Sequence, residues 1–174
     1  MKRNIVLWQS LGFVATSLLG VLLHFLFDWS GIAFTALFSA VNESTWEHMK
    51  LIFFPMFLFA CVQYFFIGKE YNYFWCIKLR GILVGVVLIP ALFYTLRGIF
   101  GTMPDWINIA IFFVSVAAAY IYETKQFQKD NPLYKYCGLA FVTLCIIAIS
   151  FALFTFIPPE IPLFQDPLNG NFGV

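Results

Sequence analysis

Long apolar segments constrain the fold of this chain more than any other feature. Five of them are long and apolar enough, or nearly so, to cross a hydrocarbon core about 30 Å thick. They cover residues 4–27, 45–67, 76–100, 105–122 and 136–157. Charged residues make up only 11% of the chain, against about a quarter in soluble proteins. The sequence therefore predicts an all-α, polytopic membrane bundle of five transmembrane helices.

The remaining residues leave no room for a soluble domain, so we expect one integral-membrane domain over residues 1–174. A dozen mostly apolar residues follow the first span, and a helix of that length rises only about 18 Å. Residues 30–41 are therefore predicted to form a short helix that is either re-entrant or interfacial. The tail, residues 158–174, contains helix-stopping prolines. Its Ile161, Leu163 and Phe164 favour a packed cap over a disordered end.

The first segment follows Lys2 and Arg3, as the apolar part of a signal peptide would. It lacks a small-residue cleavage site, and Trp8, Gln9 and His24 interrupt its apolar run. We therefore predict that it is a retained helix.

The basic residues predict the orientation. With five spans and a cytoplasmic N-terminus, only Lys50 and Arg97 lie outside. The other eight lie inside: Lys2, Arg3, Lys69, Lys78, Arg80, Lys125, Lys129 and Lys135. Because cytoplasmic loops are enriched in Lys and Arg, the N-terminus is predicted to be cytoplasmic and the tail external. A net charge of +1 without a basic stripe argues against a nucleic-acid partner.

Four cysteines lie within the predicted spans or at their cytoplasmic ends: Cys61, Cys76, Cys137 and Cys145. None falls in an outer loop, so no disulfide framework is expected. We interpret all four as small buried apolar residues.

A dense polar run, from Asn42 to Lys50, opens the second span. Ionisable groups at the edge of a membrane span indicate a functional site unless another role accounts for them. Ser44 and Glu47 fit a helix capping box, which accounts for both residues without any function. This alternative leaves Glu43 and His48 unexplained.

A polar stripe on the first span is the second sign of a site. Gln9, Thr16, Gly20, His24 and Asp28 recur at helical spacing, so they share one face. Close helix packing accounts for the first three residues, but it needs neither His24 nor Asp28.

Arg97 either reaches the headgroups or turns inward as a counter-ion to these carboxylates. The predicted ligand-binding set is therefore His24, Asp28, Glu43, Glu47, His48 and Arg97. Within it, His24, Glu43 and His48 are the expected ligands of a divalent metal ion, because two imidazoles with a carboxylate suit transition metals. The strong spacings of zinc sites, such as H-E-x-x-H, are absent.

Two segments, AVNESTWEHMKLIFFP at residues 40–55 and the proline-rich tail from Pro158 to Gly170, carry a family resemblance. They resemble a family of small bacterial multi-pass membrane proteins with a domain of unknown function. The resemblance covers most of the chain, and NESTWEH is its most specific element. It implies a bacterial cell-membrane location and brings no activity, cofactor or partner.

Three functions remain open at this point. The first is an outer-face site that binds a cation or a small polar ligand, as part of a transport or substrate-binding component. The second is a metal-dependent intramembrane hydrolase, with a carboxylate as general base and Arg97 stabilising negative charge. The third is a non-catalytic accessory subunit whose acidic face pairs with another membrane protein.

Overall fold

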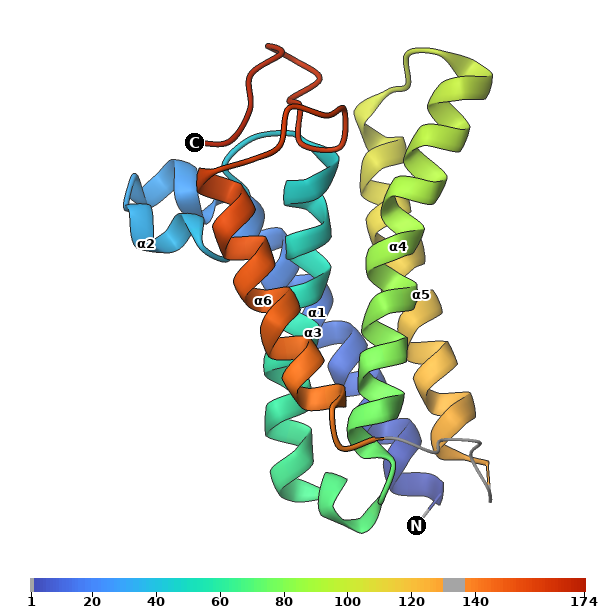
Figure 1. The fold of residues 1–174 in the computed structure, drawn as a ribbon. Helices are drawn as coiled ribbons and strands as arrows, with labels where there is room; N and C mark the ends of the chain where they lie inside the picture. Colours follow the sequence, from blue (N-terminus) through green and yellow to red (C-terminus); the bar gives the residue numbers. More distant parts are fainter. Residues whose placement is uncertain (1, 130–136) are drawn as a thin grey trace.

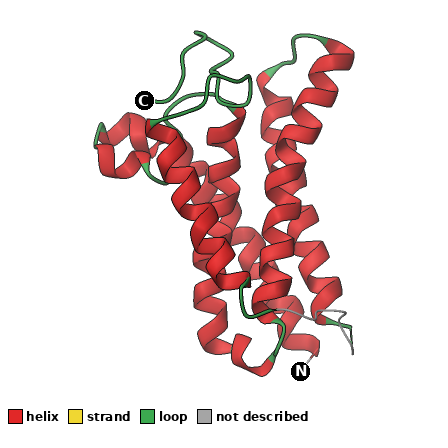
Figure 2. Cartoon of the chain, viewed as in Figure 1, coloured by secondary structure: helices red, strands yellow, loops and turns green. Residues whose placement is uncertain are grey.

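The computed structural model describes residues 2–129 and 137–174, and these residues form a helical bundle (Figures 1 and 2). The elements in chain order are α1 (Lys2–Ser30), α2 (Ala33–Ala36), α3 (Thr45–Phe66), the 3-10 turn η1 (Gly68–Glu70), α4 (Phe74–Phe100), α5 (Asp105–Phe127) and α6 (Ala140–Phe156). The all-helical class predicted from the sequence is confirmed.

Four helices, α1, α3, α4 and α5, are long and apolar enough to cross a membrane. The shorter α6 is also apolar, but its 17 residues rise only about 25 Å. The prediction of five full-length spans is therefore confirmed for four of them, and α5 runs five residues further than expected. Residue 136, where the fifth span was predicted to begin, lies outside the described residues.

The long helices that follow one another in the chain run antiparallel, and α1 packs against α3 while α4 packs against α5 (Figure 1). Further contacts join α1 to α5 and α3 to α4, and α6 packs against α3 and α4 (Figure 1). The main core cluster includes the fully buried Ile52, Phe53, Met56 and Ile82. The N- and C-termini lie at opposite ends of the bundle in Figure 1. We call these the N-terminal end and the tail end.

The polar stripe predicted on α1 faces protein from Gln9 to Gly20, whereas Asp28 at its far end is exposed. Gln9 and Thr16 are 3% and 0% exposed, and Thr16 Oγ1 lies 2.8 Å from the Tyr120 hydroxyl. A Cβ added at Gly20 would lie 2.4 Å from Phe112 and 2.9 Å from the Leu51 carbonyl oxygen. The absence of a side chain at Gly20 is therefore what allows α1 to approach α3 and α5 closely.

The helix predicted over residues 30–41 is wrong in length, since only Ala33–Ala36 are helical. Gly31 ends α1 with a φ of +61°, a conformation that glycine adopts without strain. Further on, the Ser39 hydroxyl donates to the Leu23 carbonyl and accepts from the Phe27 amide at 3.0 Å. These bonds fold the segment back onto the last turns of α1, which a continuous helix could not do.

The tail packs over the start of α3. The Trp46 amide donates to the Leu163 carbonyl at 3.0 Å, and the Trp46 and Phe164 ring centroids lie 4.6 Å apart. The Asn42 side chain donates to the Gly173 carbonyl at 2.9 Å. The tail is thus a packed cap of mostly irregular chain, as Figure 2 shows in green.

A buried ion pair joins α4 and α5 near the N-terminal end. Lys78 Nζ lies 2.6 Å from Glu123 Oε2, and the two side chains are 1% and 0% exposed. Lys78, one of the eight basic residues assigned to the cytoplasmic side, is therefore buried within the bundle and does not lie in a loop. At Gly81, α4 lies so close to α5 that an added Cβ would be 2.3 Å from Glu123 Cγ. This close packing encloses the ion pair within the bundle.

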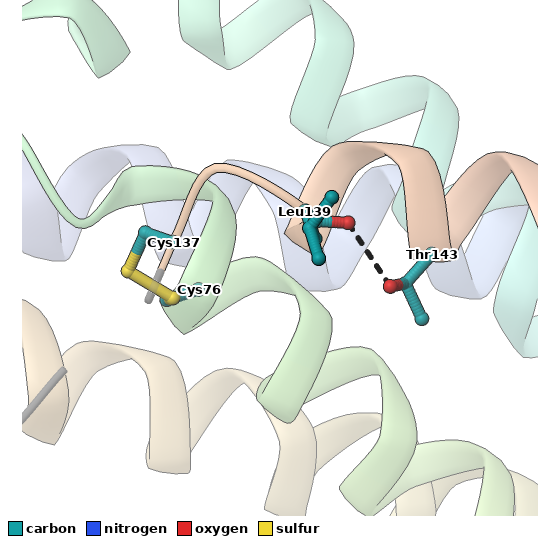
Figure 3. The surroundings of a disulfide bond; sticks show 4 residues. All are labelled: Cys76, Cys137, Leu139 and Thr143. Atoms are coloured by element: carbon teal, nitrogen blue, oxygen red, sulfur yellow. Dashed lines mark hydrogen bonds between the residues drawn. A yellow bond between two sulfur atoms is a disulfide. The ribbon is translucent and has the colours of Figure 1, made fainter. Parts of the chain in front are cut away.

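A disulfide joins Cys76 to Cys137, contrary to the expectation that all four cysteines are unpaired (Figure 3). Their Cα atoms lie 5.3 Å apart although 61 positions separate them in the sequence. Cys76 lies in the first turn of α4, and Cys137 lies three residues before α6. Both helices begin at the N-terminal end, which brings the two cysteines together. Cys61 and Cys145 are free.

Candidate functional site

Three predicted ligands, His24, Glu43 and His48, meet at the tail end of the bundle. His24 Nε2 lies 3.7 Å from Glu43 Oε1, and His48 Nε2 lies 3.5 Å from Glu43 Oε2. The two imidazole rings are 5.4 Å apart, edge to face. One potential ligand atom from each residue lies within 4.8 Å of the other two. We call this group the His–Glu cluster.

Local backbone contacts hold Glu43 between the two helices. Asn42 Oδ1 accepts from the Ser44 amide at 2.9 Å, and the Ala40 amide donates to the Leu23 carbonyl of α1 at 3.3 Å. Ser44 then caps α3, because its side chain accepts from the Glu47 amide at 3.4 Å. The loop is therefore tied to α1 on one side and to the first turn of α3 on the other.

The His48 ring has a defined orientation. Its Nδ1 lies 2.9 Å from the Ser44 carbonyl oxygen. A carbonyl can only accept, so Nδ1 carries the hydrogen, and in the neutral ring the lone pair is on Nε2. That atom faces Glu43. A backbone carbonyl that fixes the tautomer in this way is typical of metal-binding histidines.

The spacing within the His–Glu cluster also bears on its chemistry. Separations of 3.5 and 3.7 Å exceed the usual 2.7–3.2 Å of an N–H···O hydrogen bond. Two ligand atoms bound tetrahedrally at about 2.1 Å from one ion lie about 3.4 Å apart. The two histidine–carboxylate separations are close to that value, although each is to a different oxygen of Glu43, and the set with one atom per residue lies within 4.8 Å.

A cavity of about 350 Å³ adjoins the cluster between α3, α4, α5 and the tail. Glu43 and His48 line it, together with Thr45, Asp105 and Asn108. The sequence-based reasoning missed Asp105 and Asn108. Their three-residue spacing at the start of a predicted span places them on one helical face, and it could have indicated them.

Glu47 does not join the cluster. Its carboxylate lies 2.6 Å from Lys50 Nζ, and it accepts from the Thr155 hydroxyl at 3.0 Å and the Val41 amide at 3.1 Å. The reciprocal half of the predicted capping box, a bond from Glu47 to the Ser44 amide, is replaced by these contacts. Lys50 is 0% exposed, so Glu47 serves as the counter-ion of a buried lysine.

The other two predicted residues also lie apart from the cluster. Asp28 is exposed on α1 and is not among the three grouped ligands. Arg97 is exposed, its guanidinium lies 5.7 Å from the Phe93 ring centroid, and it lines a second cavity of about 310 Å³. The two cavities share Thr45, Phe93 and Pro167, so Arg97 neighbours the cluster without contacting it.

Comparisons with known proteins identify the family but no activity. Neither the curated proteins nor the solved structures contain a significant match to the chain. One family model matches residues 2–174. The protein therefore belongs to DUF6512, a family of unknown function.

Proposed function

We propose that this protein is a bacterial plasma-membrane protein that binds a divalent transition-metal ion through His24, Glu43 and His48. The observation that carries the proposal is the convergence of the three side chains, one potential ligand atom from each within 4.8 Å of the others. They come from α1, the loop before α3, and the first turn of α3. His24 on one helix, brought to Glu43 and His48 at the start of another beside a cavity, favours a binding site over a general acidic surface.

The ligand types select the class of ion. Imidazole nitrogen suits zinc, copper, nickel or iron, whereas calcium and magnesium favour sites built from oxygen ligands. Three protein ligands leave a further coordination position for water or a small polar ligand. The adjoining cavity, with Thr45 and Asn108 in its lining, offers polar groups to such a ligand.

The purified protein is expected to contain one zinc-class metal ion per chain, measured by elemental analysis after detergent extraction. A His24→Ala, His48→Ala double variant should lose it, because one carboxylate alone binds transition metals weakly. An Asp28→Asn variant is the matched control and should keep the metal. Full metal content in the double variant, or none in the wild type after zinc loading, would leave the accessory-subunit function as the better account.

Metal-dependent hydrolysis is the second candidate. Three ligands beside a cavity is the arrangement of catalytic zinc sites, in which bound water becomes a nucleophile near neutral pH. Asp105 lines the cavity and is the candidate general base. Arg97, assigned to charge stabilisation from the sequence, lines only the neighbouring cavity. Metal binding is therefore the better supported of the two functions.

We also propose that the N-terminus is cytoplasmic and that the His–Glu cluster is at the outer face. Lys50 and Lys78 each pair with a buried carboxylate, so neither is an exposed charge. Among the basic residues whose burial the structure describes, four exposed ones lie toward the N-terminal end: Lys69, Arg80, Lys125 and Lys129. An impermeant thiol reagent applied to intact cells without a wall barrier should label a cysteine introduced at Asn171 and not one at Gln126. The reverse labelling would invert the topology.

A further inference from the structure

The Cys76–Cys137 disulfide (Figure 3) joins the first turn of α4 to the residues before α6 at the N-terminal end of the bundle, whereas the His–Glu cluster is at the tail end. Its two cysteines have different surroundings. Cys76 is 7% exposed and belongs to a buried cluster with Ile77 and Phe127. Cys137 is only half-buried, and it lines a pocket of about 320 Å³ that Cys76 does not line. An incoming thiol can therefore approach Cys137 more readily than Cys76.

The pocket has a composition suited to a thiolate. Lys69 lines it, together with the polar side chains of Tyr64, Tyr71 and Asn72. A nearby ammonium group raises the thiolate fraction of a thiol, and the thiolate is the nucleophile in disulfide exchange. The pocket thus offers both access and a favourable charge on the Cys137 side of the bond.

The other sulfur is placed to leave. Cys76 is the third residue of the 27-residue α4, whose N-terminus has no side-chain cap. The first turn of a helix carries partial positive charge from the helix dipole, and this stabilises a thiolate there. A disulfide with an accessible sulfur on one side and a stabilised leaving group on the other is arranged for directional attack.

We propose that Cys76 and Cys137 form a thiol–disulfide exchange site whose reaction partner is a dithiol, such as a reduced dithiol protein. One partner thiolate attacks Cys137 Sγ, forming a mixed disulfide, and the Cys76–Cys137 bond breaks with Cys76 leaving as a thiolate. The second partner thiolate then attacks the partner sulfur of the mixed disulfide and releases Cys137. Two electrons and two protons pass to the cysteine pair, and the partner becomes a disulfide. The reverse reaction with an oxidised partner restores the Cys76–Cys137 bond.

The proposed orientation supports this inference, which rests on that part of the proposed function. With the N-terminus in the cytoplasm, the disulfide faces a reducing compartment. Disulfides in that compartment are usually transient, with catalytic or redox-sensing roles. The metal proposal is independent, because the two sites lie at opposite ends of the bundle.

The direction of attack is tested in a Cys61→Ser, Cys145→Ser background, so that only the pair remains. Adding Cys76→Ser leaves Cys137 alone, and adding Cys137→Ser leaves Cys76 alone. Both variants lack the disulfide, so each controls for the other. Oxidised glutathione should form a mixed disulfide at Cys137 at least tenfold faster than at Cys76, as read by mass spectrometry. Equal rates, or faster reaction at Cys76, would overturn the proposed direction.

The redox state of the pair in cells tests the site itself. The protein used is the full chain with Cys61→Ser and Cys145→Ser, in which Cys76 and Cys137 are both present. Acid quenching followed by alkylation with a polyethylene-glycol maleimide should show two free thiols during growth. A brief pulse of a membrane-permeant disulfide should protect both thiols, and its removal should free them again within minutes. A bond that persists during growth, or never forms after the pulse, would overturn the proposal. The labelling at Gln126 and Asn171 reports separately whether the orientation has failed.

Discussion

Replacing Lys78 with methionine is expected to lower the free energy of unfolding by about 3–5 kcal/mol, because it leaves the Glu123 carboxylate buried without its counter-ion. Glu123 is 0% exposed, and its Oε2 is 2.6 Å from the lysine amine. Four aromatic rings, those of Phe59, Phe74, Tyr120 and Phe127, have centroids 5.6–6.0 Å from the same amine. Among the residues that the structure describes, the surroundings of the amine are therefore largely aromatic and offer the unpaired carboxylate no second cation. Denaturant unfolding in mixed micelles measures the change.

The matched control is Lys125→Met on the exposed face of α5, where removal of the same charge should change stability by about 0.5 kcal/mol or less. A Lys78→Met, Glu123→Met double variant should recover much of the loss, because apolar replacements of a buried pair are often tolerated. If Lys78→Met were as mild as Lys125→Met, the buried pair would not contribute to stability as described.

Replacing Glu47 with glutamine is expected to have a similarly large effect, about 3–5 kcal/mol, because Lys50 would then be buried without a counter-ion. Loss of a helix cap alone, the role given to Glu47 by the sequence, would cost only about 1 kcal/mol. The difference arises because Lys50 is 0% exposed and bonds only to the Glu47 carboxylate, Thr155 and the Ala36 carbonyl within the described part of the chain. The same unfolding measurement applies.

Glu43→Gln provides the comparison, because it removes the same charge four residues earlier. Its side chain is 41% exposed, so stability should change by about 0.5 kcal/mol or less, while metal content falls. The two glutamates are therefore expected to separate, with Glu47 governing stability and Glu43 governing binding. A destabilising Glu43→Gln beside a harmless Glu47→Gln would contradict this division.

The helical class and the long spans could be predicted from sequence because hydrophobic length is a local property. Gln9, Thr16 and His24 were placed correctly on one stripe for the same reason, since helical spacing determines which residues share a face. The turn after Gly31 could not be predicted. It depends on Ser39 reaching back to Leu23, a contact between segments that no local pattern encodes.

The site was predictable only in part, again because some contacts are local and others are not. His24, Glu43 and His48 were recognised from residue type, and the structure brings them together. Glu47 contacts Lys50, whose i,i+3 spacing could have been read from the sequence, and Thr155, which lies 108 positions away and could not. Cys76 and Cys137 were missed because their pairing depends on two helix starts meeting at one end of the bundle. Residue spacing carries no information about such pairs.

The most direct test of the central claim is X-ray absorption at the metal edge of the zinc-loaded protein. If the metal binds at the His–Glu cluster, two imidazole nitrogens should lie about 2.0–2.1 Å from the zinc ion and a carboxylate oxygen about 2.0–2.2 Å from it. A His48→Ala variant should lose one of the two imidazoles. Sulfur scattering at about 2.3 Å would instead place the metal on cysteines, and a shell without imidazole would contradict the site altogether.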